Sequence, residues 1–232
     1  MRINMLKIKT KLKLFLRPNG KVDFLNSIPK NSYILDVGCG NNSPLVVKSF
    51  LPNSYYVGID VDNYNNDYDV EKVADEYILS DPNDFVKSLK SINSNFDAII
   101  SSHNLEHCND RMGVLDAMID KLNYKGKIYL SFPSKKSVYF PQKIGCLNYY
   151  DDPTHKDLPP DFDLILEILK EKKLKVIFSK ANYKPLLLSY IGIFSNLISF
   201  FTQKVHIGMY EIWGFESIII AENNNTTRFN CG

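Results

Sequence analysis

Three of the four histidines lie in two polar stretches whose composition suits proton transfer. His103 and His107 belong to the stretch HNLEHC, which directly follows an apolar run, and His155 ends the stretch DDPTH. An imidazole with its ordinary pKa near ~6.5 can take a proton from a hydroxyl at neutral pH. A positioned base accelerates such a reaction by roughly 10²–10⁴-fold. We therefore predict that His103 or His155 is a catalytic general base, and for His103 the alternative is packing against a bound ligand without proton transfer.

A glycine turn precedes these stretches in the chain. Gly38 and Gly40 follow the apolar run and aspartate of residues 33–36. Glycine adopts backbone angles that a Cβ penalises, and it lets a ligand approach the main chain closely. Asp60 follows Gly40 by 20 residues, at the end of a second apolar run. A nucleotide-binding unit places the acid that accepts the ribose hydroxyls at about this distance. The pattern predicts a nucleotide-type ligand, and a turn in a ligand-free unit is the alternative.

An alternating series of strands and helices is needed to hold these residues. Short apolar runs predict strands, and apolar positions at helical spacing predict helices. Ligands of an open α/β sheet bind outside the carboxyl ends of the strands, which is where Asp60 and His103 fall. Strands are predicted at 33–35, 55–59, 77–79, 96–102, 128–133, 174–178 and 215–221. Helices are predicted at 43–50, 82–90, 110–122 and 161–172, with a turn at 125–127.

Three segments resemble those of class I S-adenosylmethionine (SAM)-dependent methyltransferases. They are LDVGCG at 35–40, FDAIISSHNLEHC at 96–108 and LNYKGKIYLSFPS at 122–134, so the resemblance covers residues 33–134. It implies a Rossmann-like α/β fold, a doubly wound seven-stranded sheet with helices on both faces and an antiparallel last strand. Asn42 stands where the fuller family pattern has a third glycine, and this departure is mild because asparagine tolerates a left-handed backbone.

The resemblance also implies a cofactor and the residues that bind it. The cofactor would be SAM, with S-adenosylhomocysteine (SAH) as the product. Asp81 matches the family acid that binds the adenine amino group, and it can also cap the helix that follows. The residues expected to bind the cofactor are Asp36, Gly38, Cys39, Gly40, Asp60, Val61, Asp81, Ser102 and His103.

Two insertions, residues 135–160 and 180–213, interrupt the sheet pattern near its end. A sheet that is covered on both faces has little use for the uncharged apolar run 186–201 in the second insertion. We predict that the insertions fold together as a cap over the strand ends and form the acceptor pocket. A dimer face, or a membrane contact shared with the basic segment 1–22, is the alternative for the apolar run. The residues expected to bind the acceptor are His107, Tyr149, Tyr150, Asp152 and His155, although His107 can instead cap or pack at a helix start.

The sequence assigns no metal site. Asp151, Asp152 and His155 offer donors that suit a divalent cation, because hard cations prefer carboxylate oxygens, and this option stays open. The cysteines and histidines do not have the spacing of a zinc site.

Length and composition predict one domain over residues 1–232 with a mobile polar tail at 222–232. A net charge of +2 argues against nucleic acid as a partner, and four unpaired-looking cysteines favour a cytoplasmic location. Monomer and homodimer both remain open.

The leading hypothesis is O-methylation of a sugar or nucleotide-activated precursor of a bacterial surface polysaccharide, because DDPTH-like stretches occur in methyltransferases of that pathway. The alternatives are methylation of an RNA or protein acceptor, and a SAM-binding scaffold without catalysis.

Overall fold

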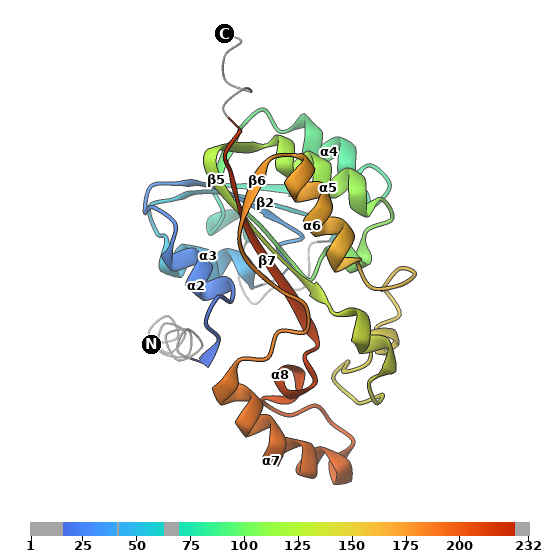
Figure 1. Cartoon of the computed structure of the whole chain (residues 1–232). Helices are drawn as coiled ribbons and strands as arrows, with labels where there is room; N and C mark the ends of the chain where they lie inside the picture. The colour runs from blue at the N-terminus through green and yellow to red at the C-terminus, as the bar shows by residue number, and fades with distance from the viewer. Residues whose placement is uncertain (1–15, 41, 63–69, 226–232) are drawn as a thin grey trace.

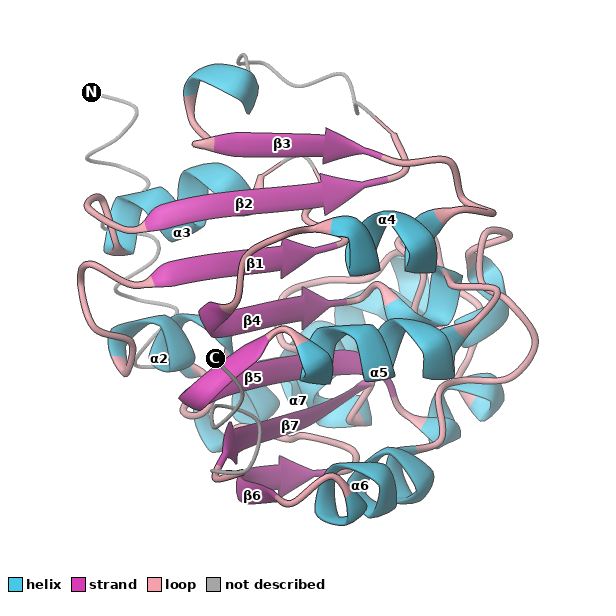
Figure 2. Ribbon diagram, turned by 90° about the horizontal axis from the view of Figure 1, so that it is seen from above, coloured by secondary structure: helices cyan, strands magenta, loops and turns pink. Residues whose placement is uncertain are grey.

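A seven-stranded sheet in the order β3-β2-β1-β4-β5-β7-β6 forms the centre of the molecule (Figures 1 and 2). The computed structural model describes residues 16–40, 42–62 and 70–225. β7 runs antiparallel to both of its neighbours, β5 and β6, while the pairs from β3 to β5 are parallel. The predicted seven-stranded fold with an antiparallel last strand is confirmed. The strands are β1 (Tyr33–Val37), β2 (Tyr55–Asp60), β3 (Glu76–Leu79), β4 (Phe96–Ser102), β5 (Leu122–Pro133), β6 (Leu174–Lys180) and β7 (Glu216–Asn223).

Helices cover both faces of the sheet because its strands are apolar on both sides. Along β1, Leu35 packs into one buried cluster and Ile34 into the other, as the period-two alternation of a strand requires. The first cluster lies beneath α4 (Phe85–Ser91), α5 (Arg111–Asp120) and α6 (Phe162–Glu171). The second lies beneath α2 (Lys21–Asn26) and α3 (Ser43–Phe50). Figure 1 shows these two helical layers on opposite sides of the sheet.

The helix after β3 begins later than predicted. Asp84 precedes its first residue, Phe85, and residues 82–84 form a turn. The carboxylate of Asp81 accepts a hydrogen bond from the backbone N–H of Asn83, 2.8 Å away, so it stabilises this turn and does not cap the helix. The predicted start at Pro82 is therefore wrong. An aspartate that bonds the backbone two residues on competes with helix formation.

The predicted turn at 125–127 is not a separate turn, because these residues lie within β5, at an irregularity in its pairing with β4. Phe96 of β4 pairs with Leu122, and Ala98, two residues later, pairs with Lys127. Residues 123–126 of β5 thus stand opposite one residue of β4, and Lys125 among them adopts a φ of 64°. At the other end of the fold, β7 continues to the buried Asn223, so Glu222 and Asn223 belong to the sheet and not to a tail. Residues 224 and 225 of the predicted tail follow the strand, and 226–232 lie outside the described residues, as do 1–15 of the basic segment and 63–69 of the link between β2 and β3.

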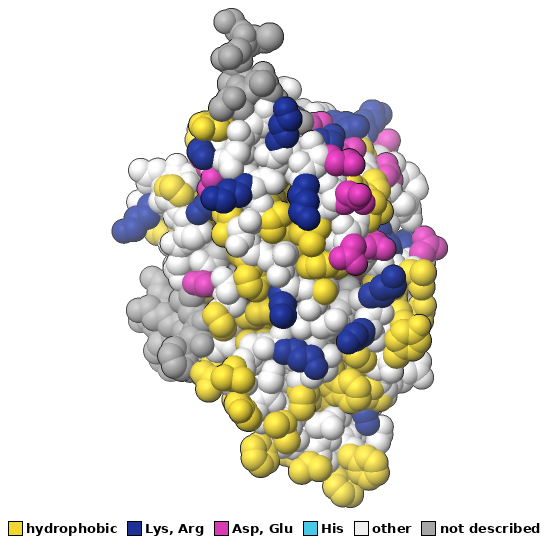
Figure 3. Space-filling view, in the orientation of Figure 1, with side chains coloured by type: hydrophobic (Ala, Val, Ile, Leu, Met, Phe, Trp, Pro, Cys, Tyr) yellow, Lys and Arg dark blue, Asp and Glu magenta, His cyan; other side chains and the backbone are white. Residues whose placement is uncertain are grey.

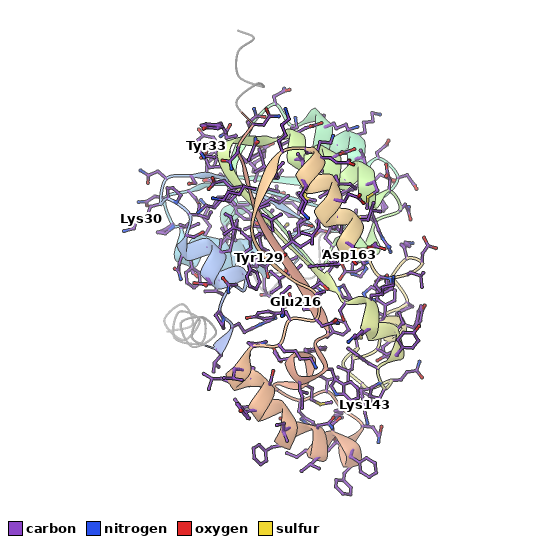
Figure 4. All side chains as sticks on the ribbon, in the orientation of Figure 1. Lys30, Tyr33, Tyr129, Lys143, Asp163 and Glu216 are labelled. Atoms are coloured by element: carbon purple, nitrogen blue, oxygen red, sulfur yellow. The ribbon has the colours of Figure 1, made fainter. Side chains whose placement is uncertain are left out.

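The two insertions pack against each other. The first contains the short 3-10 turns η3 (Lys135–Tyr139) and η4 (Tyr149–Asp151), and the second contains α7 (Leu186–Thr202) and α8 (Met209–Trp213). Phe140 and Leu147 of the first insertion share a buried cluster with Met209 of α8 and with Phe215. Lys143 donates to the carbonyl of Ser199, 3.2 Å away, near the end of α7, and Figure 4 labels its side chain there.

One face of α7 carries large apolar side chains that no described residue covers. Phe194, Phe200 and Phe201 are 70%, 71% and 84% exposed. Figure 3 shows hydrophobic side chains gathered at the end of the molecule that α7 forms in Figure 1. Among the described residues, no helix has both the length and the apolar character needed to cross a membrane.

Candidate active site

A cavity of about 800 Å³ opens at the carboxyl ends of β1, β2 and β4. This volume falls within the range of ~300–1,000 Å³ typical of small-molecule sites. Five segments of the sheet half and one segment of the first insertion line it. They contribute Gly38–Gly40 with Asn42, Asp60–Asp62, Pro82–Asn83 with Phe85–Val86, Ser102–Asn104, His107–Asp110 with Val114, and Asp152, Thr154 and Lys156.

The two glycines of the turn are required for different reasons. Both have left-handed backbones, with φ of 71° at Gly38 and 56° at Gly40. A Cβ on Gly38 would stand 2.3 Å from the side-chain oxygen of Asn104, so packing within the protein excludes a larger residue there. A Cβ on Gly40 would meet no atom of the described residues within 4 Å, apart from its two neighbours in the chain. The space at Gly40 is open because it belongs to the cavity, which lets a ligand approach the main chain.

Asp60 connects the glycine turn to the end of β2. Its Oδ2 accepts from the backbone N–H of Gly40 and its Oδ1 from that of Val61, both at 2.7 Å. A carboxylate oxygen can accept more than one hydrogen bond, so this geometry suits a diol such as a ribose. Burial, followed by the nearby carboxylates of Asp36 and Asp60, raises the pKa of the Cys39 thiol well above its ordinary value. Cys39 is therefore a neutral wall residue and not a nucleophile.

His103 lies between two carboxylates. Its Nδ1 is 3.0 Å from Oε1 of Glu106, and its Nε2 is 3.3 Å from Oε1 of Glu216. Burial opposes the charge on the ring, but hydrogen bonds and charges of Glu106 and Glu216 outweigh it and raise the pKa of His103 to about 10. The ring is then protonated at neutral pH, with both nitrogens donating. An imidazolium has no lone pair, so the structure argues against His103 as the general base.

The same network extends to the N-terminal part of the chain. The guanidinium of Arg17 donates to Oε2 of Glu216, and its Nε lies 3.7 Å from Glu211 of α8. Burial opposes ionisation of Glu216, but the charge of Arg17 and the hydrogen bond from His103 lower its pKa to about 2. Figure 4 labels Glu216 at the start of β7. The network joins α8, β7 and the segment after β4.

Arg111 holds the first insertion over the cavity. From the first turn of α5, its guanidinium donates to the carbonyls of Glu106, Lys156 and Leu158. The buried Tyr149 hydroxyl donates to the carbonyl of Lys156, 2.9 Å away. Because these carbonyls belong to both η2 (Leu105–His107) and the insertion, the contacts fix residues 152–156 at the cavity wall.

The predicted cofactor residues fall into two groups. Gly38, Cys39, Gly40, Asp60, Val61, Ser102 and His103 line the cavity. Asp36 and Asp81 do not. Asp36 lies buried beneath the turn, where it accepts from the hydroxyls of Ser43 and Tyr56 and pairs with Lys21 at 3.6 Å. Asp81 lies on the surface and shapes the turn that brings Asn83 to the wall.

The predicted acceptor residues are also divided. His107 and Asp152 line the cavity, while Tyr149 is buried behind the wall. The ring of His155 stacks on that of Tyr149, with ring centroids 4.3 Å apart. Its centroid also lies 4.8 Å from that of the His107 ring. Tyr150 borders a separate shallow depression instead. No residue of 180–213 lines the cavity, so of the two insertions only 135–160 contributes to it.

Several wall residues were not predicted from the sequence. They are Asn83, Asn104, Cys108, Asp110, Thr154 and Lys156. Thr154 and Lys156 flank His155 in the chain, so their placement followed from the prediction for 135–160. Asn104 gives no signal of its own, because its packing over Gly38 depends on a contact between distant segments.

A family model described as a methyltransferase domain matches residues 10–188. The chain belongs to this methyltransferase family. The match includes all parallel strands, the cavity and the whole first insertion.

Solved structures of methyltransferases share the fold. A SAM-dependent methyltransferase of Archaeoglobus fulgidus is 20% identical with a TM-score of 0.52, and 95% of this chain and 94% of that one are covered. The plantazolicin methyltransferase BpumL, in complex with SAH, is 19% identical with a TM-score of 0.55, at 95% and 90% coverage. N-methyltransferase NodS of Bradyrhizobium japonicum, also with SAH, is 11% identical with a TM-score of 0.53, at 96% and 98% coverage.

One curated relative also matches in sequence. An uncharacterized protein of Methanocaldococcus jannaschii is 28% identical in an alignment of 123 residues that covers 47% of this methyltransferase chain. The matched region spans only 30% of that relative's length.

Glu216 supplies a prediction about stability and pH. Its carboxylate stays ionised in the folded chain down to about pH 2, whereas the ordinary value is 4.5. The stabilisation of the folded state by the ionised Glu216 carboxylate is therefore fully present above about pH 4.5 and is lost as the pH falls toward 2. We expect Glu216→Gln to lower the free energy of unfolding at pH 7 by about 3 kcal/mol, at ~1.4 kcal/mol per pKa unit. Denaturant titrations at several pH values measure this, and the deficit of the variant should shrink on acidification.

Glu222→Gln is the matched control, because it changes a carboxylate of the same strand that pairs with Lys125 at 3.4 Å and is more exposed. Its effect should be small. Equal deficits for the two variants would show that the buried network adds nothing specific.

Proposed function

We propose that this methyltransferase transfers a methyl group from SAM to a hydroxyl of a small, polar acceptor. The observation that carries the proposal is one cavity that is lined both by the glycine turn with Asp60 and by His107, Asp152, Thr154 and Lys156. SAM, when bound, supplies a methyl group already activated on a sulfonium, and SAH is the product. The protein's task is alignment, which contributes up to ~7–11 kcal/mol in model systems.

The cofactor end suits the adenosyl group in shape and in hydrogen bonding. The open space at Gly40 and the paired backbone contacts of Asp60 support ribose binding beside the turn. We assign Gly38, Cys39, Val61, Ser102 and His103 to the same end, because all of them line the cavity. Asp36 and Asp81 are assigned positioning roles, one beneath the turn and one in the loop after β3.

The acceptor end is polar. Asp152, Thr154 and Lys156 bring a carboxylate, a hydroxyl and an ammonium to one wall. These groups suit a ligand with many hydroxyls, and an ammonium also suits a phosphate. They support a sugar or a nucleotide-activated sugar as the acceptor. We propose that this acceptor is a precursor of a bacterial surface polysaccharide, modified in the cytoplasm. The cysteines Cys39, Cys108 and Cys146 are free in the structure, in keeping with a reducing compartment.

We assign activation of the acceptor hydroxyl to His107 and His155. Both rings are oriented by hydrogen bonds through Nδ1, to Thr154 Oγ1 at 2.9 Å and to the Tyr149 carbonyl at 2.6 Å. Nε2 of a neutral ring held in this way keeps its lone pair. Such a nitrogen can take a proton itself or hold a cation that polarises the hydroxyl. His103 is held between two carboxylates and is assigned a positioning role in the cavity wall.

The competing functions fit the site less well. An RNA acceptor would call for a broad basic surface, and the chain has a net charge of only +2. A scaffold without catalysis would be favoured by a blocked space over His103, but the side chain of His103 is 39% exposed and lines the cavity. A protein acceptor remains the second candidate, because the cavity is open to the surface.

Asp60 provides the first test. Asp60→Asn removes one acceptor from the proposed ribose site while keeping the shape of the side chain. We expect SAH to bind at least tenfold more weakly, a loss of ~1.4 kcal/mol or more by calorimetry. Glu71→Gln removes the same charge outside the cavity and should leave the affinity unchanged. Unchanged SAH affinity in a folded Asp60→Asn protein would rule out the assignment.

The two imidazoles provide the second test. We expect His107→Gln and His155→Gln each to lower turnover by roughly 10²-fold or more, while SAH affinity stays at the wild-type value. The assay is methyl transfer to a panel of sugars, nucleotide sugars and related activated precursors. His206→Gln, in the segment between α7 and α8, is the control. If both cavity variants keep full turnover on the acceptor that the wild type uses, neither ring activates it.

The uncovered face of α7 supports a peripheral membrane contact. The helix contains no charged residue, and the exposed lysines Lys184 and Lys204 flank its two ends. Apolar side chains that enter the lipid interface, with flanking cations near anionic headgroups, are the pattern of an interfacial helix. Such a contact would bring the enzyme to a membrane where surface polysaccharides are assembled.

We expect the full-length protein to sediment with vesicles of anionic lipid, and the double variant F194S/F201S to bind them at least tenfold more weakly, a change of ~1.4 kcal/mol. Tyr139→Ser is the control, because Tyr139 is 86% exposed but lies outside α7. If the protein does not bind vesicles, and light scattering shows a dimer for the wild type but a monomer for the double variant, the face is a homodimer interface.

A further inference from the structure

Three potential metal ligands lie close together beside the cavity, and one of them, His107, lines it. Glu106, His107 and His155 each bring one donor atom within 4.8 Å of the donors of the other two. The first two residues are neighbours in η2, and the third comes from the first insertion. The cluster differs from the one considered on sequence grounds, because Asp151 instead accepts from the backbone N–H groups of Lys143 and Asn148.

The hydrogen bonds of both histidines set the tautomer that a metal requires. A carbonyl oxygen can only accept, so His155 Nδ1, 2.6 Å from the Tyr149 carbonyl, carries the proton. Thr154 donates its hydroxyl proton to Asp152 Oδ1 at 2.6 Å, so its oxygen accepts from His107 Nδ1 at 2.9 Å. Each neutral ring is left with a lone pair on Nε2. Metal-binding histidines characteristically donate their other N–H to a carbonyl or a similar acceptor in this way.

Glu106 is an independent indication of a missing ligand. The residue is fully buried, and Oε1 of its carboxylate bonds His103. Its other oxygen, Oε2, is buried without a hydrogen-bond partner among the described residues. A buried acceptor left unsatisfied costs about 1–3 kcal/mol, and more when it is charged. A cation beside Oε2 would remove this penalty.

We propose that Glu106, His107 and His155 bind a divalent cation of the zinc type, with a coordination position open toward the acceptor. Two imidazoles and one glutamate with an open position form one of the ligand sets of catalytic zinc. Mg²⁺ and Ca²⁺ are disfavoured because they prefer an all-oxygen set. Bonds of ~2.0–2.2 Å place ligands roughly 3–4 Å apart, so small side-chain shifts close the present separation.

The site deepens the proposed function and rests on it for the identity of the bound hydroxyl. A cation of this type lowers the pKa of a hydroxyl that it binds, so that the oxygen becomes a better nucleophile at neutral pH. Asp152, whose Oδ2 lies 3.9 Å from His155 Nε2, is placed to accept the proton that the hydroxyl releases. His107 and His155 would then act as ligands and not as bases.

The test is direct binding of Zn²⁺ to the full-length protein after dialysis against a chelator. Titration in competition with a fluorescent zinc indicator should give one site per chain. We expect His107→Gln and His155→Gln each to weaken binding at least tenfold, and His206→Gln to leave it unchanged. Co²⁺ in place of Zn²⁺ should give visible absorption bands that either cavity variant removes. Glu106→Gln should also weaken binding, with SAH affinity as the check that this buried variant has folded.

The outcomes separate this inference from the proposed function. Absence of stoichiometric Zn²⁺ binding, or binding that neither histidine variant weakens, would overturn the metal site. If in addition the chelator-treated enzyme turns over at the full rate and the histidine variants do not, the proposed function survives and the rings act as bases. Zn²⁺ binding at these residues in a protein that fails to bind SAH would leave the metal site standing and refute the proposed function.

Discussion

A row of alternating charges, Arg17–Glu216–His103–Glu106, holds together the end of the sheet where the cavity opens. Each carboxylate in the row is almost fully buried, and each depends on a cation beside it. Removing one member of such a set leaves an uncompensated buried charge, which typically destabilises a protein by about 3–5 kcal/mol. The row therefore fixes β7, the segment after β4 and the N-terminal residues relative to one another.

This constraint decides which groups remain for chemistry. The carboxylates on either side of His103 raise the pKa of its ring, which argues against a role as general base. Glu106 directs one oxygen to His103, and its backbone carbonyl accepts from Arg111 and from the N–H of Lys156. The next residue, His107, then faces the cavity beside the DDPTH segment. The groups that we propose to act on the acceptor are thus brought together by a network of charges whose role is structural.

Much of the fold could be predicted from local patterns. The apolar runs gave all seven strands: the inner strands are buried on both faces, and the edge strands β3 and β6 keep short apolar runs although they are partly exposed. The antiparallel position of β7 followed from the family resemblance. The start of α4 at Phe85 could not be predicted, because Asp81 bonds the backbone of Asn83 and delays the helix. The role of His103 was beyond sequence reasoning, since it depends on Glu216, 113 residues away. Of the two insertions only 135–160 lines the cavity. The separation of α7 from the cavity could not be predicted, because an apolar run shows only that a face needs cover and not what covers it.

A crystal structure of the full-length protein with SAH tests the central claim most directly, namely that one cavity joins a cofactor end at the glycine turn to an acceptor end at the first insertion. We expect the ribose hydroxyls to lie on Asp60, and the sulfur to be directed toward His107 and residues 152–156 at no more than about one helix diameter, ~10 Å. SAH bound elsewhere, or with its sulfur farther than this from the first insertion, would contradict this arrangement.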